Sequence, residues 1–279
     1  MMLHALSLTR RFLLTTAVLA LAWSAHSSAA VSVAVAGNQA TAEIQLGTVE
    51  AELILSFDAA ENLSPAALNI SAQLVSLADP LLLARLPSGG LTSLPSALPL
   101  LITVEPPNGS GFALNNTVRV EIHTHALPYT AGSHFRLYKA PLGGSFKDIT
   151  DEVAPGSVRA RGTTGGFSQF LILTDLRPSS SVIAGKLAEL RTRCADAPAA
   201  LSGNLQSQLD AVEAALDNAA HGTALAALEQ FRADVSAAAG NGLSNRWTPS
   251  DRSHNVAGDL LAAAASLKFS IGYLRDWGE

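Results

Sequence analysis

The chain has 279 residues, with 18 Lys or Arg and 23 Asp or Glu, so its formal net charge at pH 7 is −5. Binding to nucleic acid or to an anionic membrane surface depends on clustered basic residues, and the few basic residues here are scattered, which argues against both partners. The hydrophobic content of 48% and the single cysteine predict packed cores without internal disulfides.

The N-terminal segment 1–30 predicts an export signal. Arg10 and Arg11 are followed by an apolar run, FLLTTAVLALAW, and by small residues that a signal peptidase requires before Val31. A membrane anchor is the alternative, but a spanning helix needs about twenty apolar residues. The arginine pair also resembles a twin-arginine signal, although the general secretory route fits better. We expect cleavage before Val31, no membrane span afterwards, and a periplasmic or secreted mature protein.

Residues 31–176 alternate between apolar and polar side chains, and turn residues interrupt the pattern every eight to twelve positions or so, which is typical of an antiparallel sandwich or barrel. No crossover helix joins one predicted strand to the next, which argues against a parallel sheet. The predicted strands are 31–35, 42–46, 51–57, 68–75, 100–104, 117–125, 134–138, 145–149, 157–161 and 167–174.

The last part of this region, FRLYKAPLGGSFKDIT, SVRARG and GFSQFLILTD, resembles the end of many extracellular, immunoglobulin-like β-sandwich modules. The resemblance covers about forty residues and implies an architecture, an antiparallel β-sandwich domain, without any active site. It also implies that Phe146, Phe167 and Phe170 are core aromatics.

After a short linker at 177–182, the apolar residues follow a helical period through the segment 183–279. Leu205, Leu209 and Val212 belong to one predicted stripe, and similar stripes occur around 187–190, 225–235 and 256–274. Four helices joined by short turns are expected to form a small antiparallel bundle, which gives an α+β, multidomain fold. Cys194 falls on the apolar stripe of the first helix, which favours a buried small side chain over a reactive thiol.

The run LQSQLDAVEAALDNAAHGTALAALEQFRADVSAAAG resembles the helical FIMAH-type module that is appended to secreted bacterial proteins. The whole chain resembles an uncharacterised family of exported Gram-negative bacterial proteins that join a β-sandwich to such a C-terminal module. The resemblance implies an organism class and an architecture, and no activity.

Glu121, His123 and His125 form the sharpest candidate site. In a strand they share one face, opposite Val120 and its apolar neighbours, and the two imidazoles lie about 7 Å apart. Two histidines at this spacing could bind one metal ion, with His134 as a third ligand. The alternative interpretation is a solvated polar strand face, which this short pattern favours.

Arg246 and Trp247, with Asp251 and His254, form a second candidate, a ligand-binding aromatic with charged neighbours. The structural interpretation is a helix start, in which Thr248 caps the helix and the ring packs on Arg252. The leucine-rich segment 81–101 has no helical or alternating period. It either exposes an apolar patch for a partner protein or packs beneath its own loop.

No nucleophile elbow, phosphate loop or dinucleotide motif is present, and no cofactor is predicted. The leading interpretation is an exported, non-enzymatic protein that binds an envelope protein or a small ligand. The alternative is a metal-dependent exported hydrolase that uses Glu121, His123 and His125.

Overall fold

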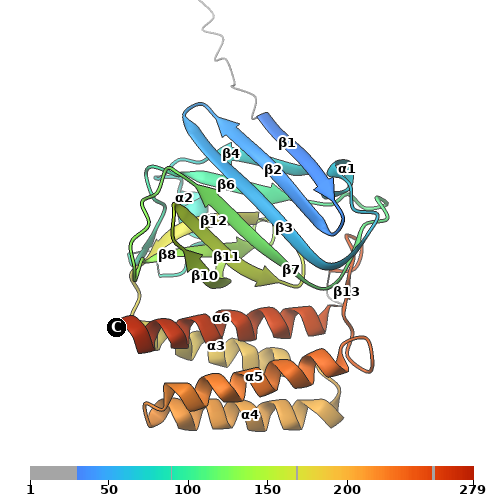
Figure 1. Ribbon diagram of the computed structural model, residues 1–279, viewed down its shortest axis with the longest axis vertical. Helices are drawn as coiled ribbons and strands as arrows, with labels where there is room; N and C mark the ends of the chain where they lie inside the picture. The colour runs from blue at the N-terminus through green and yellow to red at the C-terminus, as the bar shows by residue number, and fades with distance from the viewer. Residues whose placement is uncertain (1–29, 89, 168, 253–254) are drawn as a thin grey trace, which may run out of the picture.

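A computed structural model describes residues 30–88, 90–167, 169–252 and 255–279. Two antiparallel sheets form the N-terminal part of the chain, and long helices form the C-terminal part, so the fold is mixed α and β (Figure 1). The helices lie in layers beneath the two sheets, and α6 is the layer next to the strands (Figure 1). A candidate ligand pocket lies at this junction.

The first sheet is antiparallel and has the order β1-β2-β3-β7-β11-β10, with β13 paired to β7. Its strands are β1 (Ala30–Ala36), β2 (Gln39–Leu46), β3 (Val49–Glu61), β7 (Ala113–Thr124), β10 (Thr150–Ala154), β11 (Val158–Thr164) and β13 (Arg246–Trp247). Gly37 and Gly47 have positive φ values of 57° and 62° in the tight turns that join the first three strands, a conformation that glycine adopts at low cost.

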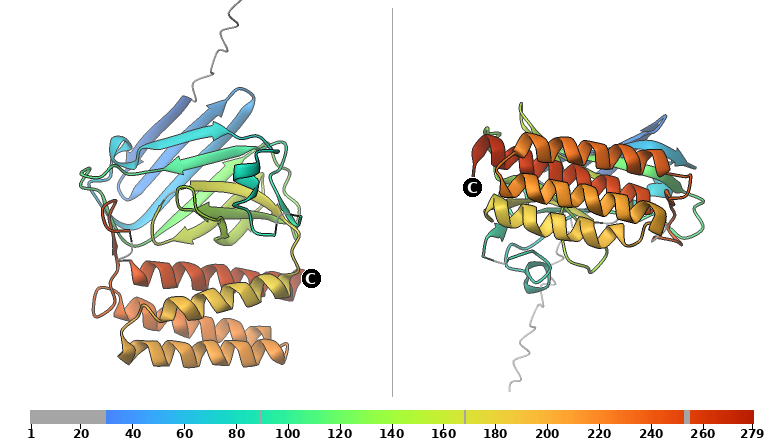
Figure 2. Two further views of the ribbon diagram at one scale, coloured as in Figure 1. Left: turned by 180° about the vertical axis from the view of Figure 1, so that it is seen from behind. Right: turned by 90° about the horizontal axis from the view of Figure 1, so that it is seen from below.

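The second sheet lies behind the first, as the rear view in Figure 2 shows, and has the order β4-β6-β12-β8-β9, with β5 paired to β12. Its strands are β4 (Ile70–Leu74), β5 (Thr92–Ser93), β6 (Leu100–Val104), β8 (Phe135–Ala140), β9 (Lys147–Asp148) and β12 (Gln169–Asp175). Two single-turn helices, α1 (Pro65–Leu68) and α2 (Pro80–Leu83), precede β4 and β5.

One hydrophobic core takes side chains from both sheets. Leu53 and Leu55 of β3 contribute from the first sheet, and Ile102 and Phe170 contribute from the second, all at 0% exposure. Alternation explains this arrangement, because every second residue of an extended strand points to the same face. Each such side chain contributes roughly 1.5 to 3 kcal/mol relative to exposure.

The predicted core aromatics Phe146, Phe167 and Phe170 are all buried. Phe146 belongs to a smaller core with Tyr138, separate from the core that contains Phe167 and Phe170. The prediction of one strand over 68–75 was wrong at its start, because Leu68 ends α1 and Asn69 turns the chain with φ 47°. The separate strand β10 was not predicted, since its sequence TDEVA has little alternation.

The C-terminal part contains the four predicted long helices, which run side by side when seen from below (Figure 2). They are α3 (Ser179–Cys194), α4 (Ala199–Asp217), α5 (His221–Ala238) and α6 (Val256–Trp277). The predicted stripe residues Leu205, Leu209 and Val212 are each 0% exposed in the shared helical core. No helix of the described residues is long and apolar enough to cross a membrane.

The start of α3 falls inside the expected linker. α3 begins at Ser179, directly after Pro178, so the serine-rich end of 177–182 is helical. Serine is common in loops, but a preceding proline with an extended conformation is also a frequent helix start. Cys194 is 0% exposed in the helical core, and burial raises the pKa of its thiol to about 11, in agreement with a small buried side chain.

The expected helix start at Thr248 was wrong. Trp247 is in strand β13, Thr248 and Asp251 pair in the turn that follows, and α6 begins only at Val256 with Asn255 as its cap. A threonine followed by proline and an acid fits a turn as well as a capping box, and the pairing of β13 with β7 decides between the two.

The backbone at the N-terminus of α6 lies so close to the first sheet that the glycines at the contact have no room for a side chain. A Cβ atom at Gly165 would lie 2.8 Å from the backbone of Asp259, and one at Gly258 would overlap the carbonyl oxygen of Asn116. Asn255 completes the contact, because its side-chain amide donates to the carbonyls of Asn116 and Gly165 at 2.6 and 2.7 Å and its oxygen accepts from the backbone of Gly258. The helix axis is therefore fixed relative to the sheet.

We predict that Gly258→Ala lowers the free energy of unfolding by about 1 to 3 kcal/mol, since the added methyl group must push α6 away from the sheet. Gly272→Ala, in the same helix, is the matched control because nothing lies within 4 Å of its would-be Cβ. This control should raise stability by about 0.5 to 1 kcal/mol through helix propensity. Urea unfolding of both variants measures the difference, and equal stabilisation by both would contradict the proposed close approach.

Candidate functional site

The three residues of the predicted metal site lie on the outer face of the first sheet, as expected, but their side chains have separate partners. Glu121 accepts from Arg159 Nη1 at 2.8 Å and from Arg161 Nε at 2.5 Å. Desolvation raises the pKa of Glu121, but the hydrogen bonds and charges of the two arginines outweigh it, so the net shift is downward. The carboxylate is thus neutralised by guanidinium groups.

The imidazoles of His123 and His125 are adjacent, with ring centroids 4.9 Å apart in an edge-on arrangement. His123 contacts Ser157 and Glu52 through its two ring nitrogens. His134 is elsewhere, just before β8, with its ring 6.4 Å from that of Tyr273. Within the part of the chain that the structure describes, no group of three His, Cys, Asp or Glu side chains is arranged to hold a metal ion.

The second predicted site is mostly structural. Trp247 is 3% exposed and packs edge-on against Phe167 at 5.6 Å in the core between the sheets, so its ring is closed to a ligand. Arg246 is paired with Glu61 on the sheet edge. The guanidinium of Arg252 lies 5.9 Å from the indole centroid, which agrees with the predicted packing. His254 lies outside the described residues.

Some leucines of the segment 81–101 pack beneath their own loop, and others are exposed, so each of the two predicted alternatives holds for part of the segment. Leu82, Leu86 and Leu94 are buried in the smaller core with Tyr138, beneath their own loop. Leu81 remains 79% exposed and Leu91 45% exposed. The loop therefore covers the second sheet with most of its leucines.

A pocket of about 250 Å³ lies at the junction of the sheets and the helices. The strands β8, β9 and β11 form one wall, and α3 and α6 form the other. Small side chains on α6, among them Ala262 and Ser266, leave the space open. Pockets at such junctions are frequent sites for small ligands.

The charged side chains that line this pocket are paired, with one exception. Glu189 of α3 accepts from Lys147 at 2.6 Å and from Arg193 at 2.8 Å, and Arg193 also lies 3.3 Å from Asp259. Burial is the largest single effect and raises the pKa of Glu189, but the hydrogen bonds and charges of Lys147 and Arg193 together outweigh it, so the net shift is downward. These pairs leave Lys139 as the exception.

Lys139 of β8 donates from Nζ to the hydroxyl of Thr164 at 2.6 Å, the one bond that its ammonium makes within the described residues. An ammonium has three donors, so two point to no protein acceptor there. Burial lowers the pKa of Lys139 to about 8, an effect that the carboxylate of Asp259 opposes and the charges of Arg193 and Lys147 reinforce. A half-buried lysine with a depressed pKa in a pocket is a candidate functional group.

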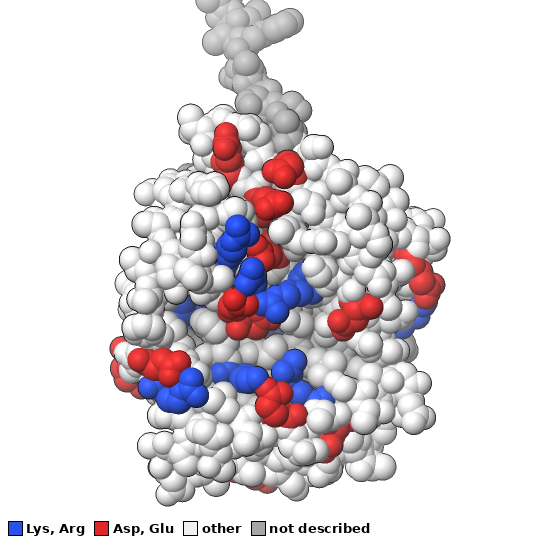
Figure 3. Space-filling model, viewed as in Figure 1, with Lys and Arg blue, Asp and Glu red and all other residues white. Residues whose placement is uncertain are grey.

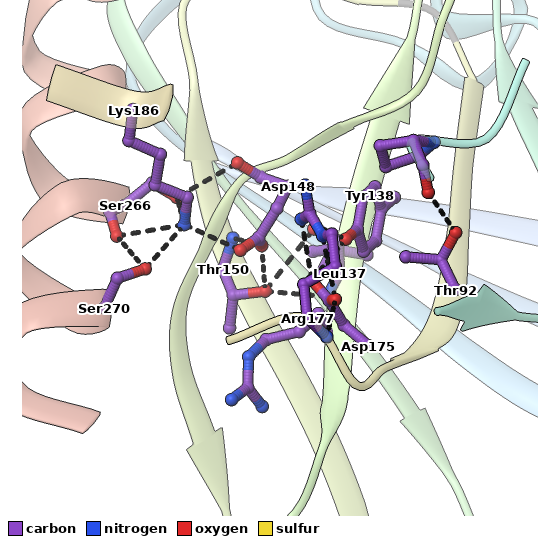
Figure 4. Close-up of polar contacts among 12 residues, drawn as sticks. Thr92, Leu137, Tyr138, Asp148, Thr150, Asp175, Arg177, Lys186, Ser266 and Ser270 are labelled. Carbon is purple, nitrogen blue, oxygen red and sulfur yellow. Dashed lines mark hydrogen bonds and ion pairs between the residues drawn. The ribbon is translucent and has the colours of Figure 1, made fainter. Parts of the chain in front are cut away.

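Two of the lining residues, Lys186 and Asp148, form a buried ion pair (Figure 4). Lys186 Nζ of α3 lies 2.6 Å from Asp148 Oδ2 of β9, with side-chain exposures of 12% and 2%. The same ammonium donates to the hydroxyls of Ser266 and Ser270 on α6 at 2.7 and 2.9 Å. The second carboxylate oxygen of Asp148 accepts from the backbone and hydroxyl of Thr150. This network joins strand, α3 and α6.

A second polar network joins β8 to the end of β12 (Figure 4). Tyr138 donates its phenolic hydrogen to Asp175 at 2.6 Å, and Arg177 pairs with the same carboxylate at 2.7 Å. Burial raises the pKa of Tyr138, so the hydroxyl remains a donor. The network ties the end of β12 to the start of the helical part.

Sequence reasoning missed the pocket because its residues are far apart in the chain. Lys139, Asp148, Lys186 and Asp259 have no shared motif, and each looks like an ordinary surface charge. One signal was present in the sequence: Lys186 follows Ile183 and precedes Leu187 on the apolar side of the first helix, where a charge requires a buried partner.

The architecture is thus two sheets and a helical layer, with a pocket between them. The chain belongs to a family of unknown function, DUF6689, whose match extends over residues 13–275. No curated protein and no solved structure is significantly similar to the chain.

We predict that Lys186→Met lowers the free energy of unfolding by about 3 to 5 kcal/mol, because Asp148 would remain charged and buried without its counter-ion. The double variant Lys186→Met/Asp148→Asn should recover a large part of this loss. Arg191→Met is the control on the same helix; its partner Asp210 is 69% exposed, and a loss below about 1 kcal/mol is expected. A single variant as stable as the parent in chemical denaturation would rule out the buried pair.

Proposed function

We propose that this protein is an exported binding protein that holds a small anionic ligand in the pocket between its sheets and its helices. The observation that carries the proposal is Lys139, whose ammonium has donors to spare in a pocket where the other basic groups are paired. The role at this pocket is binding without a catalytic step.

The ligand class follows from size and charge. Four basic side chains line the pocket against three acidic ones, so an added anion would find a net positive surrounding. A volume of about 250 Å³ is just below the range of roughly 300 to 1,000 Å³ that is common for ligand pockets, which favours a compact molecule. A small carboxylate or phosphate would accept two hydrogen bonds from Lys139 and contact Thr164 and Ser145.

The cost of Lys139 to the fold supports the same interpretation. A lysine whose pKa falls from 10.5 to about 8 on folding is charged in the folded protein at pH 7 at an unfavourable free energy of roughly 3 kcal/mol. Such a destabilising group is common where function requires it. A bound anion would offset the cost by supplying the missing counter-charge.

We also propose the cellular and architectural setting. The N-terminal segment directs the chain to the periplasm or the medium of a Gram-negative bacterium, the two sheets form an immunoglobulin-like β-sandwich, and the helices form a FIMAH-like module. The core shared by both sheets and the separate helical core support this architecture. The pocket then lies where the two modules meet.

Among the residues that the structure describes, no grouping of metal ligands supports the metal-dependent hydrolase. Glu121 is bound to two arginines, and His134 lies in the loop just before β8 of the other sheet. We therefore place ligand binding first.

We predict that the mature protein binds small carboxylates or inorganic phosphate, as measured by titration calorimetry, and that Lys139→Met abolishes the binding while raising stability. Affinity should be constant below pH 8 and fall as pH rises above it, because the free protein then loses the proton that makes Lys139 a cation. The unfolded lysine keeps its proton up to its higher pKa, so parent stability should rise with pH above 8.

Lys268→Met is the matched control, because Lys268 lies on α6 outside the pocket and pairs with Glu229. This variant should bind as the parent does. The proposal is ruled out if the Lys139 variant binds as tightly as the parent, or if none of the small anions tested binds to the parent.

We further predict that the exported protein begins at Val31. Expression in a Gram-negative host followed by intact-mass and N-terminal peptide mass spectrometry measures the processed end. If the protein recovered from the cell envelope still contains residues 1–30, the membrane-anchor alternative is favoured.

A further inference from the structure

The outer face of the first sheet brings together a glutamate of β3, a histidine of β7 and a serine of the turn before β11. In the pairing of β3 with β7, Glu52 is opposite His123, and in the pairing of β7 with β11, Arg159 is opposite His123. Ser157 is two residues before Arg159, in the turn that leads from β10 into β11, so it lies on the same face. Charged side chains gather on this face of the molecule (Figure 3).

The hydrogen bonds give the three side chains distinct roles. His123 Nδ1 lies 3.4 Å from Glu52 Oε2, and His123 Nε2 lies 2.6 Å from Ser157 Oγ. A carboxylate can only accept, so its contact favours the tautomer with the proton on Nδ1. Nε2 is then unprotonated and accepts the serine hydroxyl hydrogen. This is the arrangement of nucleophile, base and orienting acid that activates serine for acyl transfer.

We propose that Ser157, His123 and Glu52 form a hydrolytic site for small esters that carry a positive charge. In the first step Ser157 Oγ attacks the ester carbonyl carbon while its proton passes to His123 Nε2. The imidazolium then returns the proton to the leaving alcohol as the carbon–oxygen bond breaks. Water attacks the acyl-serine by the same route, so that the acid is released and Ser157 regains its hydrogen.

The substrate class follows from the hollow beside His123. A cavity of about 380 Å³ is lined by Glu43, Glu50 and Glu52 together with His123 and His125. Three carboxylates would attract an ammonium group on the substrate. The ring of His125, adjacent to that of His123, would donate to the oxyanion that forms on the carbonyl oxygen. An anionic ester would be repelled.

This activity is independent of the ligand pocket. Ser157 precedes β11, whereas Thr164, which contacts Lys139, ends the same strand. Seven residues of extended strand separate them by about 20 Å. Failure of one proposal therefore leaves the other unaffected.

The test uses the full mature chain with a fluorophosphonate probe and with two alkyl esters, acetylcholine and its neutral isostere 3,3-dimethylbutyl acetate. We expect the probe to attach to Ser157, which peptide mass spectrometry locates, with loss of fluoride. We expect hydrolysis of acetylcholine with a kcat/KM at least tenfold above that of the neutral ester. Ser157→Ala should abolish both labelling and hydrolysis.

Three variants make the test specific. Ser56→Ala removes an exposed serine of β3 on the same sheet and should retain full activity. Glu52→Gln should lower kcat by at least tenfold, since the wrong histidine tautomer is then populated. His125→Ala should lower kcat more than it changes KM. Melting temperatures equal to that of the parent confirm that the variants are folded.

A serine that merely ties the hairpin to His123 would behave differently. It would take up no fluorophosphonate, and hydrolysis by the parent would equal that of Ser157→Ala. Either that result, or labelling at another serine with activity retained in Ser157→Ala, overturns the proposal.

Discussion

The amide side chain of Asn255 is the contact on which the arrangement of sheets and helices depends. It is 1% exposed, caps the first turn of α6, and donates to two carbonyls of the first sheet. A single side chain therefore satisfies a helix end and two backbone acceptors that the junction would otherwise bury without partners, each worth about 1 to 3 kcal/mol if left unsatisfied. Because Gly165 and Gly258 remove the side chains that would hold the two backbones apart, the helix approaches closely enough for these bonds to form.

The pocket is a consequence of how α6 is held at two places. Near its start the helix contacts the sheet directly, through glycine and asparagine, and further along it is tied through Ser266 and Ser270 to the pair of Lys186 and Asp148. Between these places α6 presents alanines, which are too short to fill the gap to β8 and β11. The buried ion pair adds little net stability, because the attraction between the two charges roughly equals the free-energy cost of removing them from water. Its main effect is on the positions of the elements that it joins. Its directional bonds fix the distance between α3, α6 and the β9 edge.

The sequence was sufficient for features that depend on local period. The apolar pattern predicted a strand over 100–104, which are the bounds observed for β6. The leucine stripe in the sequence of α4 predicted the buried side chains around Leu209. It failed where distant partners decide. Thr248 and Pro249 fit a helix start locally, but pairing of β13 with β7 makes them a turn. Likewise Glu121 and His123 share a strand face as predicted, yet Arg161 and Ser157, supplied by another strand, determine what each side chain can do. No pattern in one strand contains the register of its neighbours.

The two proposed sites occupy opposite ends of β11, and the strand pairing of that sheet makes their effects separable. Residues more than about 7 to 10 Å apart without shared partners act almost additively on stability. Lys139 contacts Thr164 at one end, while His123 contacts Ser157 at the other, and the described bonds of the two sites have no residue in common. The depressed pKa of Lys139 arises mainly from burial at the helical junction, among side chains that do not contact Ser157 or His123. If the proposed ligand binds in the pocket, we therefore expect it to stabilise the junction between α6 and the sheet without changing the hydrogen bonds of Ser157 and His123.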